Sequence, residues 1–236
     1  MTKFLRNLAS LVIIATMAIS PAFGIHKKQL TKLQETQHKA MHEIVMVDRD
    51  ADGTIIGGGL CTAYAVAPNV LLTAEHCNDA QATGVYIDAP QQLVRANKAG
   101  SYTIVARIFD HEDHMLLVLS NVNFKNTIVL TAHVRVPVQG EHTYQWGCPG
   151  GIRDQYREGV VMGIMPKDPD DNEIDASGDI YLIQESVTGG DSGSAIFAEN
   201  DNQLIGVLTY GISNGQYAGM YAIAFTQAQL DAAGVK

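Results

Sequence analysis

Short apolar segments alternate with turn residues along most of the chain. From Ile44 onward these runs recur about every 8 to 15 residues and are separated by Gly, Pro, Asn and Asp. The 22 glycines also indicate many tight turns. This pattern predicts an all-β barrel or sandwich rather than a helical bundle. The predicted strands read EIVMV, GTIIGGGLCTAYAVA, NVLLTA, ATGVYIDA, SYTIVARIF, HMLLVLS, TYQWG, YREGVVMGIM, IYLIQES, GSAIFAE, QLIGVLTYG and YAGMYAIAF.

Two segments at the ends of this region have a helical pattern instead. The first lies in an N-terminal amphipathic segment, residues 25–43, which we interpret either as a pro-segment or tether, or as a helix that caps the fold. The second, TQAQLDAAG, predicts a short C-terminal helix. The apolar stripe of the first segment and its continuation consists of Leu30, Leu33, Gln37, Met41 and Ile44.

The first 24 residues have the organisation of a signal peptide. Lys3 and Arg6 precede the apolar run LASLVIIATMAIS, and Ala22 and Gly24 follow it at the spacing of a cleavage site. The run is short for a membrane span, which needs about 20 apolar residues. We therefore expect a secreted or periplasmic protein that begins near Ile25 and does not stay in the membrane. An uncleaved anchor is the alternative.

Composition limits the function classes. Hydrophobic residues make up 46% of the 236 residues and charged residues 17%, so the chain can bury a substantial core in one large domain or two small ones. The formal net charge of -9 argues against nucleic acid as the main partner, because phosphate binding needs a basic surface. Oligomeric state is left open.

The three cysteines have no zinc-site spacing, so we expect no metal and no cofactor. In an oxidising compartment two of them can form a disulfide, and one is left over. A bond between Cys61 and Cys77 would pin the loop that holds His76. In the chain-entropy model a loop of that size contributes roughly 3 kcal/mol.

Two acidic segments imitate calcium sites. DRDADG resembles the start of an EF-hand loop, but its twelfth position is Gly59 and no helices flank it, so a hairpin turn is the better prediction. The second is a solvated acidic loop that could hold calcium. Its carboxylates are Asp168, Asp170, Asp171, Glu173, Asp175 and Asp179.

The segment TGGDSGS raises the question of an activated serine. A serine hydroxyl is a weak nucleophile that needs a base, a group that orients the base, and N–H donors for the oxyanion. Ser192 lies among glycines that let a backbone approach a substrate closely. His76, after an apolar strand, is a candidate base. Asp113 and Asp110, before another apolar strand, compete for the orienting role, and an ordinary turn would explain either.

Together these segments resemble the chymotrypsin/trypsin family of serine peptidases. TAEHC resembles T-A-A-H-C, DHMLLVL resembles D-I-A-L-L-x-L, and GGDSGS resembles G-D-S-G-G. GVLTYG and AGMYAIAF resemble G-I-V-S-W-G and P-G-V-Y-T-x-V. The five segments follow the family order from about Ile44 to the C-terminus, and the spacing of Cys61 and Cys77 fits as well.

The resemblance implies an all-β fold of two six-stranded antiparallel barrels, at residues 44–136 and 137–236, the second followed by the C-terminal helix. It implies that Ser192 attacks the scissile carbonyl, that His76 transfers the proton, and that Asp113 orients His76. The N–H groups of Gly190 and Ser192 would form the oxyanion hole. The implied activity is a secreted serine endopeptidase acting on polypeptides.

The family pattern also gives a specificity pocket. Ser186 matches its floor, Gly211 and Gly219 match its walls, and Tyr210 would flank it. Because the floor carries no acid, we expect an apolar or aromatic side chain before the cut.

Two of the departures from the family pattern concern activation and the unmatched cysteine. The activation start I-V-G-G is absent, so we hypothesise that no trypsin-type activation is needed and that Asp191 has a partner other than a freed amine. Cys148 has no matched partner and is a free thiol or an intermolecular link. The alternatives to an active secreted enzyme are a catalytically inactive trypsin-fold binding protein and a membrane-anchored viral or phage-type processing protease.

Overall fold

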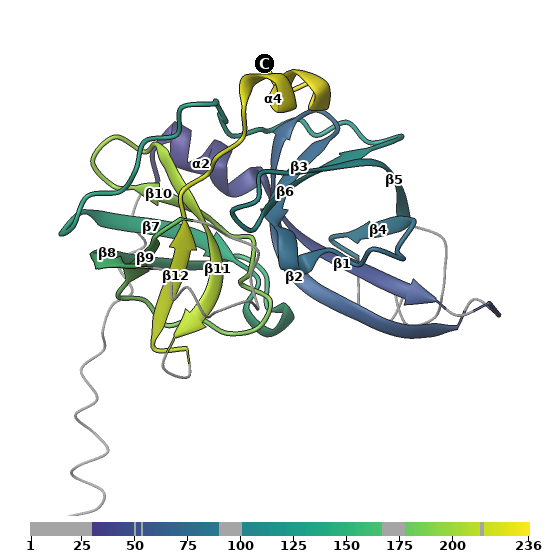
Figure 1. Ribbon diagram of the computed structural model, residues 1–236, viewed down its shortest axis with the longest axis horizontal. Coiled ribbons are helices and arrows are strands. Elements are labelled where there is room, and N and C mark those ends of the chain that lie inside the picture. Colours follow the sequence, from purple (N-terminus) through teal and green to yellow (C-terminus); the bar gives the residue numbers. More distant parts are fainter. Residues whose placement is uncertain (1–29, 50, 53, 90–100, 167–177, 213–214) are drawn as a thin grey trace, which may run out of the picture. The chain divides into compact units, whose positions relative to one another are not determined.

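The computed structural model describes residues 30–49, 51–52, 54–89, 101–166, 178–212 and 215–236. Thr31–Lys236 form one compact unit, which consists mainly of strands (Figure 1). The predicted signal peptide and residues 168–175 of the acidic loop lie outside the described residues. No helix in the described ranges is both long and apolar enough to cross a membrane.

Twelve antiparallel strands form two closed six-stranded barrels, which confirms the predicted fold class. Both barrels have the same strand order. It is β1-β2-β3-β6-β5-β4 in the first barrel and β7-β8-β9-β12-β11-β10 in the second. Each predicted apolar run overlaps one strand. The first barrel consists of β1 (Met41–Arg49), β2 (Ile55–Ala67), β3 (Val70–Ala74), β4 (Gly84–Ile87), β5 (Ser101–Phe109) and β6 (His114–Leu119). The second consists of β7 (His142–Gly147), β8 (Gln155–Met165), β9 (Ile180–Ile183), β10 (Ala195–Ala198), β11 (Leu204–Ile212) and β12 (Tyr217–Tyr221).

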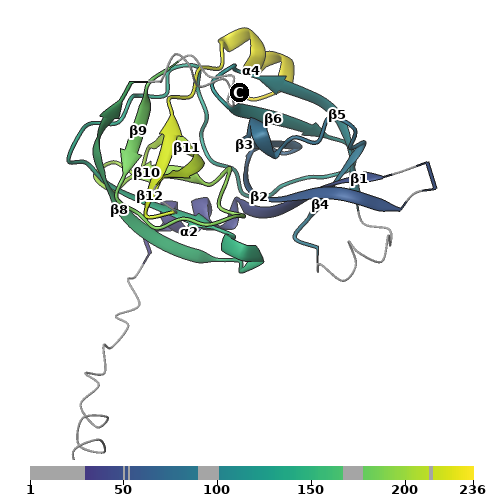
Figure 2. The same cartoon turned by 60° about the horizontal axis from the view of Figure 1, so that its bottom comes forward.

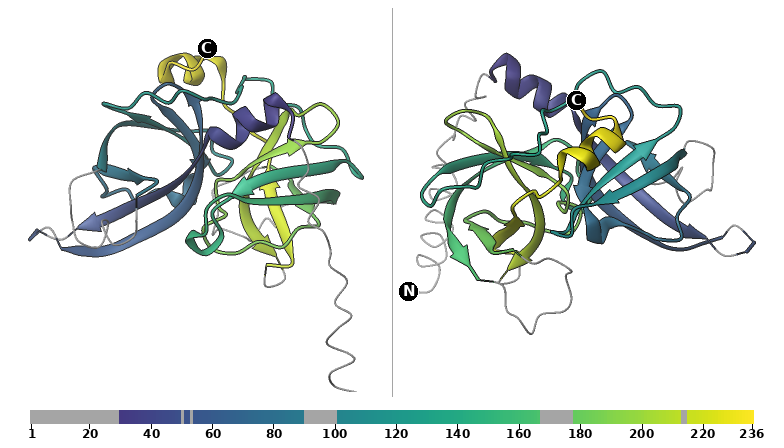
Figure 3. Two further views of the ribbon diagram at one scale, coloured as in Figure 1. Left: turned by 180° about the vertical axis from the view of Figure 1, so that it is seen from behind. Right: turned by 45° about the horizontal axis from the view of Figure 1, so that its top comes forward.

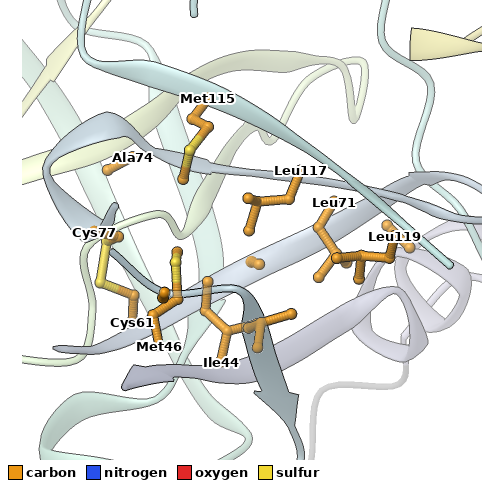
Figure 4. Packing of buried hydrophobic residues seen from close by; sticks show 13 residues of the cluster. Ile44, Met46, Cys61, Leu71, Ala74, Cys77, Met115, Leu117 and Leu119 are labelled. Atoms are coloured by element: carbon orange, nitrogen blue, oxygen red, sulfur yellow. A yellow bond between two sulfur atoms is a disulfide. The ribbon is translucent and has the colours of Figure 1, made fainter. Parts of the chain in front are cut away.

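The core of the first barrel is aliphatic and sulfur-rich. Ile44, Met46, Leu71, Met115 and Leu117 are at most 1% exposed and point into the barrel (Figure 4). The alternation of strand side chains brings these residues from β1, β3 and β6 to one interior. A disulfide joins Cys61 to Cys77 at the edge of this cluster, as predicted. It ties β2 to the segment that follows β3.

Two α-helices lie in the described residues, and both are short. α4 (Gln227–Ala233) begins at the N-cap Thr226 and ends at Gly234, whose φ of 78° suits glycine, and it confirms the predicted C-terminal helix. α4 lies close to β5 (Figure 2). The Gln229 amide donates to the Phe109 carbonyl, which fastens α4 to the end of β5.

α2 (Lys32–Lys39) is shorter than the helical stripe predicted. Met41 and Ile44 belong to β1 instead, where they pair with Tyr64 and Cys61 of β2. Strand pairing therefore overrides the local helical pattern, and Leu33 of that stripe is 49% exposed. α2 lies against the second barrel (Figure 3). It contacts this barrel through polar groups, since Gln37 accepts a hydrogen bond from Tyr144 of β7 and donates to the Asn202 carbonyl.

The EF-hand-like segment is the turn of the β1–β2 hairpin. Arg49 pairs with Ile55 at its end, which confirms the hairpin prediction.

Candidate active site

The topology brings His76 and the Asp113 segment to one end of neighbouring strands. His76 lies in the 3-10 turn η1 (Glu75–Cys77) directly after β3, and Asp113 directly precedes β6. β3 and β6 are paired antiparallel, with Ala74 opposite His114. The residue after the first strand and the residue before the second therefore meet.

Both carboxylate oxygens of Asp113 are used to hold His76. Oδ1 accepts from the His76 backbone N–H at 2.9 Å, and Oδ2 lies 2.8 Å from His76 Nδ1. Asp113 is 3% exposed, whereas the His76 side chain is 39% exposed. Asp113 has a φ of 60°, a conformation that aspartate tolerates better than most residues. The pair thus presents Nε2 of a fixed imidazole toward solvent.

Asp110, the competing candidate, forms a separate pair. Its Oδ2 lies 2.7 Å from Nδ1 of the fully buried His114 and accepts from the Ala224 N–H at 2.9 Å. Its Oδ1 accepts from the N–H groups of Glu112 and His114. Burial alone would raise the pKa of Asp110, but the hydrogen bonds from His114 and the backbone lower it. Asp110 thus fastens the Asp113 loop to the segment after β12.

The three glycines around Ser192 differ in whether the backbone has room for a side chain at their positions. Gly190 has a φ of 99°, and a Cβ on it would lie 2.4 Å from the Cys148 carbonyl oxygen. Gly193 has a φ of 88°, and its Cβ would lie 2.0 Å from the Thr62 carbonyl oxygen. Gly189 has no atom within 4 Å of such a position. Two of the three glycines are therefore required by the backbone, and the third faces open space.

Thr62 of β2 holds the Ser192 turn from the first barrel. Its N–H donates to the Ser192 carbonyl at 2.8 Å, and its hydroxyl donates to the Gly190 carbonyl at 2.8 Å. From the second barrel, Gly193 N–H donates to the Leu208 carbonyl of β11. Thr62 directly follows Cys61, so adjacent residues of one strand connect to the His76 turn and to the Ser192 turn.

Ser192 and His76 line one pocket of about 390 Å³. The Ser192 hydroxyl is 3.4 Å from the Thr209 carbonyl, which it meets as a donor. In the part of the chain that the structure describes, no hydrogen bond joins this hydroxyl to His76. Catalytic hydrogen bonds are often long without substrate and tighten when it binds. The remaining lining residues are Val187, Thr188, Gly189, Leu208, Thr209, Tyr210, Gly211 and Gly215.

Of the four predicted specificity residues, Tyr210 and Gly211 line this pocket. Ser186 and Gly219 are not among its lining residues. The Ser186 carbonyl accepts from Arg157 Nη1 at 3.0 Å, and Gly219 packs against the Tyr210 ring, where a Cβ would lie 3.0 Å from Cζ.

Val187 narrows the same pocket. A Cβ on Gly211 would lie 3.0 Å from Val187 Cγ2, so the two walls approach each other closely. The Val187 N–H donates to the Gly215 carbonyl at 2.8 Å, which fixes this spacing.

Asp191 has a partner other than a freed amine, as hypothesised. Arg157 of β8 forms a two-pronged pair with it: Nη1 lies 2.6 Å from Oδ2, and Nη2 contacts Oδ1. Asp191 is fully buried and also accepts from the Thr188 N–H at 2.9 Å. A buried carboxylate needs such a charged, hydrogen-bonded partner. The Asp191 pair therefore fixes the residue next to Ser192.

Cys148 is a buried free thiol, which favours that alternative over an intermolecular link. Burial raises its pKa to about 12, so it stays protonated and unreactive at neutral pH. Within the described residues, no group of three or more His, Cys, Asp or Glu side chains is placed to hold a metal ion.

Two six-stranded barrels, with a serine turn from one beside a histidine and an aspartate of the other, define the double-barrel class of serine hydrolases. The trypsin family model matches residues 34–229. The chain therefore belongs to the trypsin family of serine-type endopeptidases. No curated protein sequence matches it significantly.

Solved structures share the fold at low sequence identity. The active form of the Rv3671c protease from M. tuberculosis is 16% identical with a TM-score of 0.63, covering 87% of this chain and 85% of that one. Protease Anisep from Arthrobacter nicotinovorans is 19% identical with a TM-score of 0.58, covering 85% and 98%. The HtrA-type protease AlgW with tripeptide is 16% identical with a TM-score of 0.59, covering 84% and 60%.

The sequence reasoning missed Thr62, Arg157 and Val187. Arg157 is the one basic residue of β8, and the sequence around it does not mark it for a role. Its side chain reaches Asp191 because of the register of β8 against β7. Thr62 could have been suspected from its position beside Cys61.

Gly190→Ala tests the backbone of the Ser192 turn. We expect labelling of Ser192 by a fluorophosphonate to slow by about 100-fold or more, because the methyl group must displace the turn that carries the N–H groups of Gly190 and Ser192. The matched control is Gly189→Ala, which should keep the labelling rate within about threefold since nothing lies near its Cβ. Circular dichroism would verify that both variants are folded. Equal labelling of both variants would contradict this account of the turn.

Proposed function

We propose that the protein is a secreted serine endopeptidase that uses Ser192, His76 and Asp113 to cut polypeptides through an acyl-enzyme. The observation that carries the proposal is the buried Asp113 carboxylate holding His76 by two hydrogen bonds beside the Ser192 pocket. Family membership supports the reaction class.

The geometry supports the following steps. Ser192 Oγ attacks the scissile carbonyl carbon while its proton passes to His76 Nε2. The same proton then goes to the leaving amine as the C–N bond breaks, which leaves an ester on Ser192. Water, deprotonated by His76, hydrolyses that ester and restores the serine. Asp113 keeps Nδ1–H of His76 fixed and stabilises the imidazolium.

In this mechanism the N–H groups of Gly190 and Ser192 bind the oxyanion that forms on the scissile carbonyl. Within the described part of the chain, neither group donates to another backbone carbonyl. The carbonyls of both residues face Thr62 instead, which leaves the N–H groups free for a ligand. Preorganised donors of this kind each contribute about 3 kcal/mol to transition-state stabilisation.

The preferred side chain before the cut is apolar. Of the apolar and aromatic side chains expected from the sequence, the contacts of Val187 with Gly211 and the Gly215 carbonyl favour small ones such as alanine or valine. An aromatic ring would have to displace Val187 from its position against Gly211 and Gly215.

Export to an oxidising compartment is supported by the Cys61–Cys77 disulfide. It agrees with the signal peptide proposed for residues 1–24. The contacts of α2 with the second barrel favour a helix that caps the fold over a detachable pro-segment.

Replacing Ser192 or His76 by alanine tests the reaction. We expect the folded wild-type protein to hydrolyse a peptide library and to react with a fluorophosphonate. Either variant should lose hydrolysis by about 10⁴-fold or more, because the nucleophile and its base act as a unit. A folded wild-type protein with no activity would support the inactive binding protein instead.

Val187→Gly tests the pocket. We expect the wild type to cleave after alanine or valine better than after phenylalanine, measured as kcat/KM on matched peptides. The variant should raise the phenylalanine value relative to alanine by about tenfold, because volume is released in the pocket. Val105→Gly, a substitution at an exposed site of the first barrel, serves as the control and should leave the ratio unchanged. An unchanged ratio in Val187→Gly would remove Val187 from the specificity pocket.

Mass spectrometry of the exported protein tests the location. We expect a mature N-terminus near Ile25. A purified protein that retains residues 1–24 would favour the membrane-anchored alternative.

A further inference from the structure

A second carboxylate lies beside the Arg157–Asp191 pair. Glu185 follows β9 and is 5% exposed. Gln145 of β7 stands directly opposite Arg157 of β8 in the strand register, so both side chains project to the same face. Glu185 Oε1 accepts a hydrogen bond from the Gln145 amide N–H and lies 3.3 Å from Arg157 Nε.

Three polar atoms in this cluster have no hydrogen-bond partner among the described residues. They are Glu185 Oε2, Gln145 Oε1 and Arg157 Nε. The first two belong to side chains that already touch through their other polar atoms. The contact between this amide and this carboxylate therefore leaves two acceptor atoms, Glu185 Oε2 and Gln145 Oε1, without a donor. A proton on Glu185 would supply the missing donor. Its Oε2–H would then donate to Gln145 Oε1, and the two side chains would close a cyclic pair.

The charges lead to the same result. The cluster holds one guanidinium and two buried carboxyl groups, Asp191 and Glu185, so two negative charges would exceed the single positive one. Arg157 donates to Asp191 through both Nη1 and Nη2, and it makes no hydrogen bond to Glu185. Burying an uncompensated charge is costly, and a group in that position keeps its proton instead.

We propose that Glu185 is held as an uncharged carboxylic acid paired with the Gln145 amide, and that in this form it positions the Ser192 turn by leaving Arg157 to Asp191. This inference rests on the proposed function, because the Asp191 pair matters for activity only if Ser192 reacts. Once ionised, Glu185 competes for Arg157 through the nearby Nε, and the hold on Asp191 weakens. Glu185 is thus a positioning residue.

The groups that face Glu185 account for its titration. Burial raises the pKa of Glu185 to about 7, against the lowering effects of Arg157 and of the Gln145 hydrogen bond, and Asp191 adds to the rise. Tyr64 of β2, which interacts with Arg157, stays uncharged because burial raises its pKa well above the ordinary value. The cluster therefore changes charge through Glu185 in the neutral range.

Glu185→Gln tests the proposal, because glutamine imitates the protonated acid in shape and hydrogen bonding. Glu35→Gln on the exposed face of α2 is the matched control. In ¹³C-glutamate-labelled wild type, one carboxyl resonance should titrate near pH 7 and be absent from Glu185→Gln alone. A Glu185 resonance that titrates near 4.5, the ordinary value for glutamate, overturns the proposal.

Stability gives a second readout that does not depend on activity. Because the pKa of Glu185 is raised in the folded state, the unfolded chain loses this proton at a lower pH than the folded protein. The free energy of unfolding of the wild type, relative to that of Glu185→Gln, therefore falls as pH rises from about 4.5 to about 7 and then stays level. Urea midpoints at a series of pH values would measure this. A pH-independent difference overturns the protonated state.

The rate of fluorophosphonate labelling tests the link to Ser192. We expect the ratio of the Glu185→Gln rate to the wild-type rate to be near one at pH 5.5 and to rise roughly threefold to tenfold by pH 9, because small misplacement of reacting groups slows catalysis. A flat ratio with a resonance that titrates near 7 shows that Glu185 does not act through Arg157 and overturns the positioning role. Absence of labelling in every protein at every pH would instead reject the proposed function, while the resonance and the urea midpoints would still decide the protonation state.

Discussion

The buried charge of Asp191 constrains the rest of the site. This carboxylate lies beside Ser192, is fully buried, and is held by both prongs of Arg157 from β8. Removing the partner of such a charge typically costs about 3–5 kcal/mol, because an uncompensated ion remains in the interior. The conformation of the Ser192 turn, and with it the direction of the Gly190 and Ser192 N–H groups, therefore depends on a side chain in β8.

Thr62 completes this arrangement from the other barrel. Its N–H and hydroxyl hold the carbonyls of Ser192 and Gly190, while the adjacent Cys61 is bonded to the residue after His76. Asp113 then fixes His76 from the paired strand β6. These directional contacts connect the two barrels at the site, and none of them involves a residue of α2.

Local patterns predicted the strands well, because half-buried and buried strands leave apolar runs between turn residues. They predicted His76, Asp113 and Ser192 only through ordered short segments that resemble a family. The helical stripe through Met41 and Ile44 was wrong, since pairing with β2 decided the structure there. Residue chemistry alone left Asp110 and Asp113 as competitors, and only the family resemblance selected Asp113. The structure places Asp113 on His76 and Asp110 on His114. Arg157 and Glu185 left no sequence signal, because their meeting depends on register and barrel closure.

In this protein, Arg157 replaces a freed N-terminal amine as the partner of Asp191. The most direct measurement is the fluorophosphonate labelling rate of the folded protein with its N-terminus blocked by acetylation, compared with the same protein unblocked. The account predicts equal rates, because the Arg157 pair is complete without any amine. Labelling that appears only when the N-terminus is free, together with burial of that amine against Asp191, would contradict it.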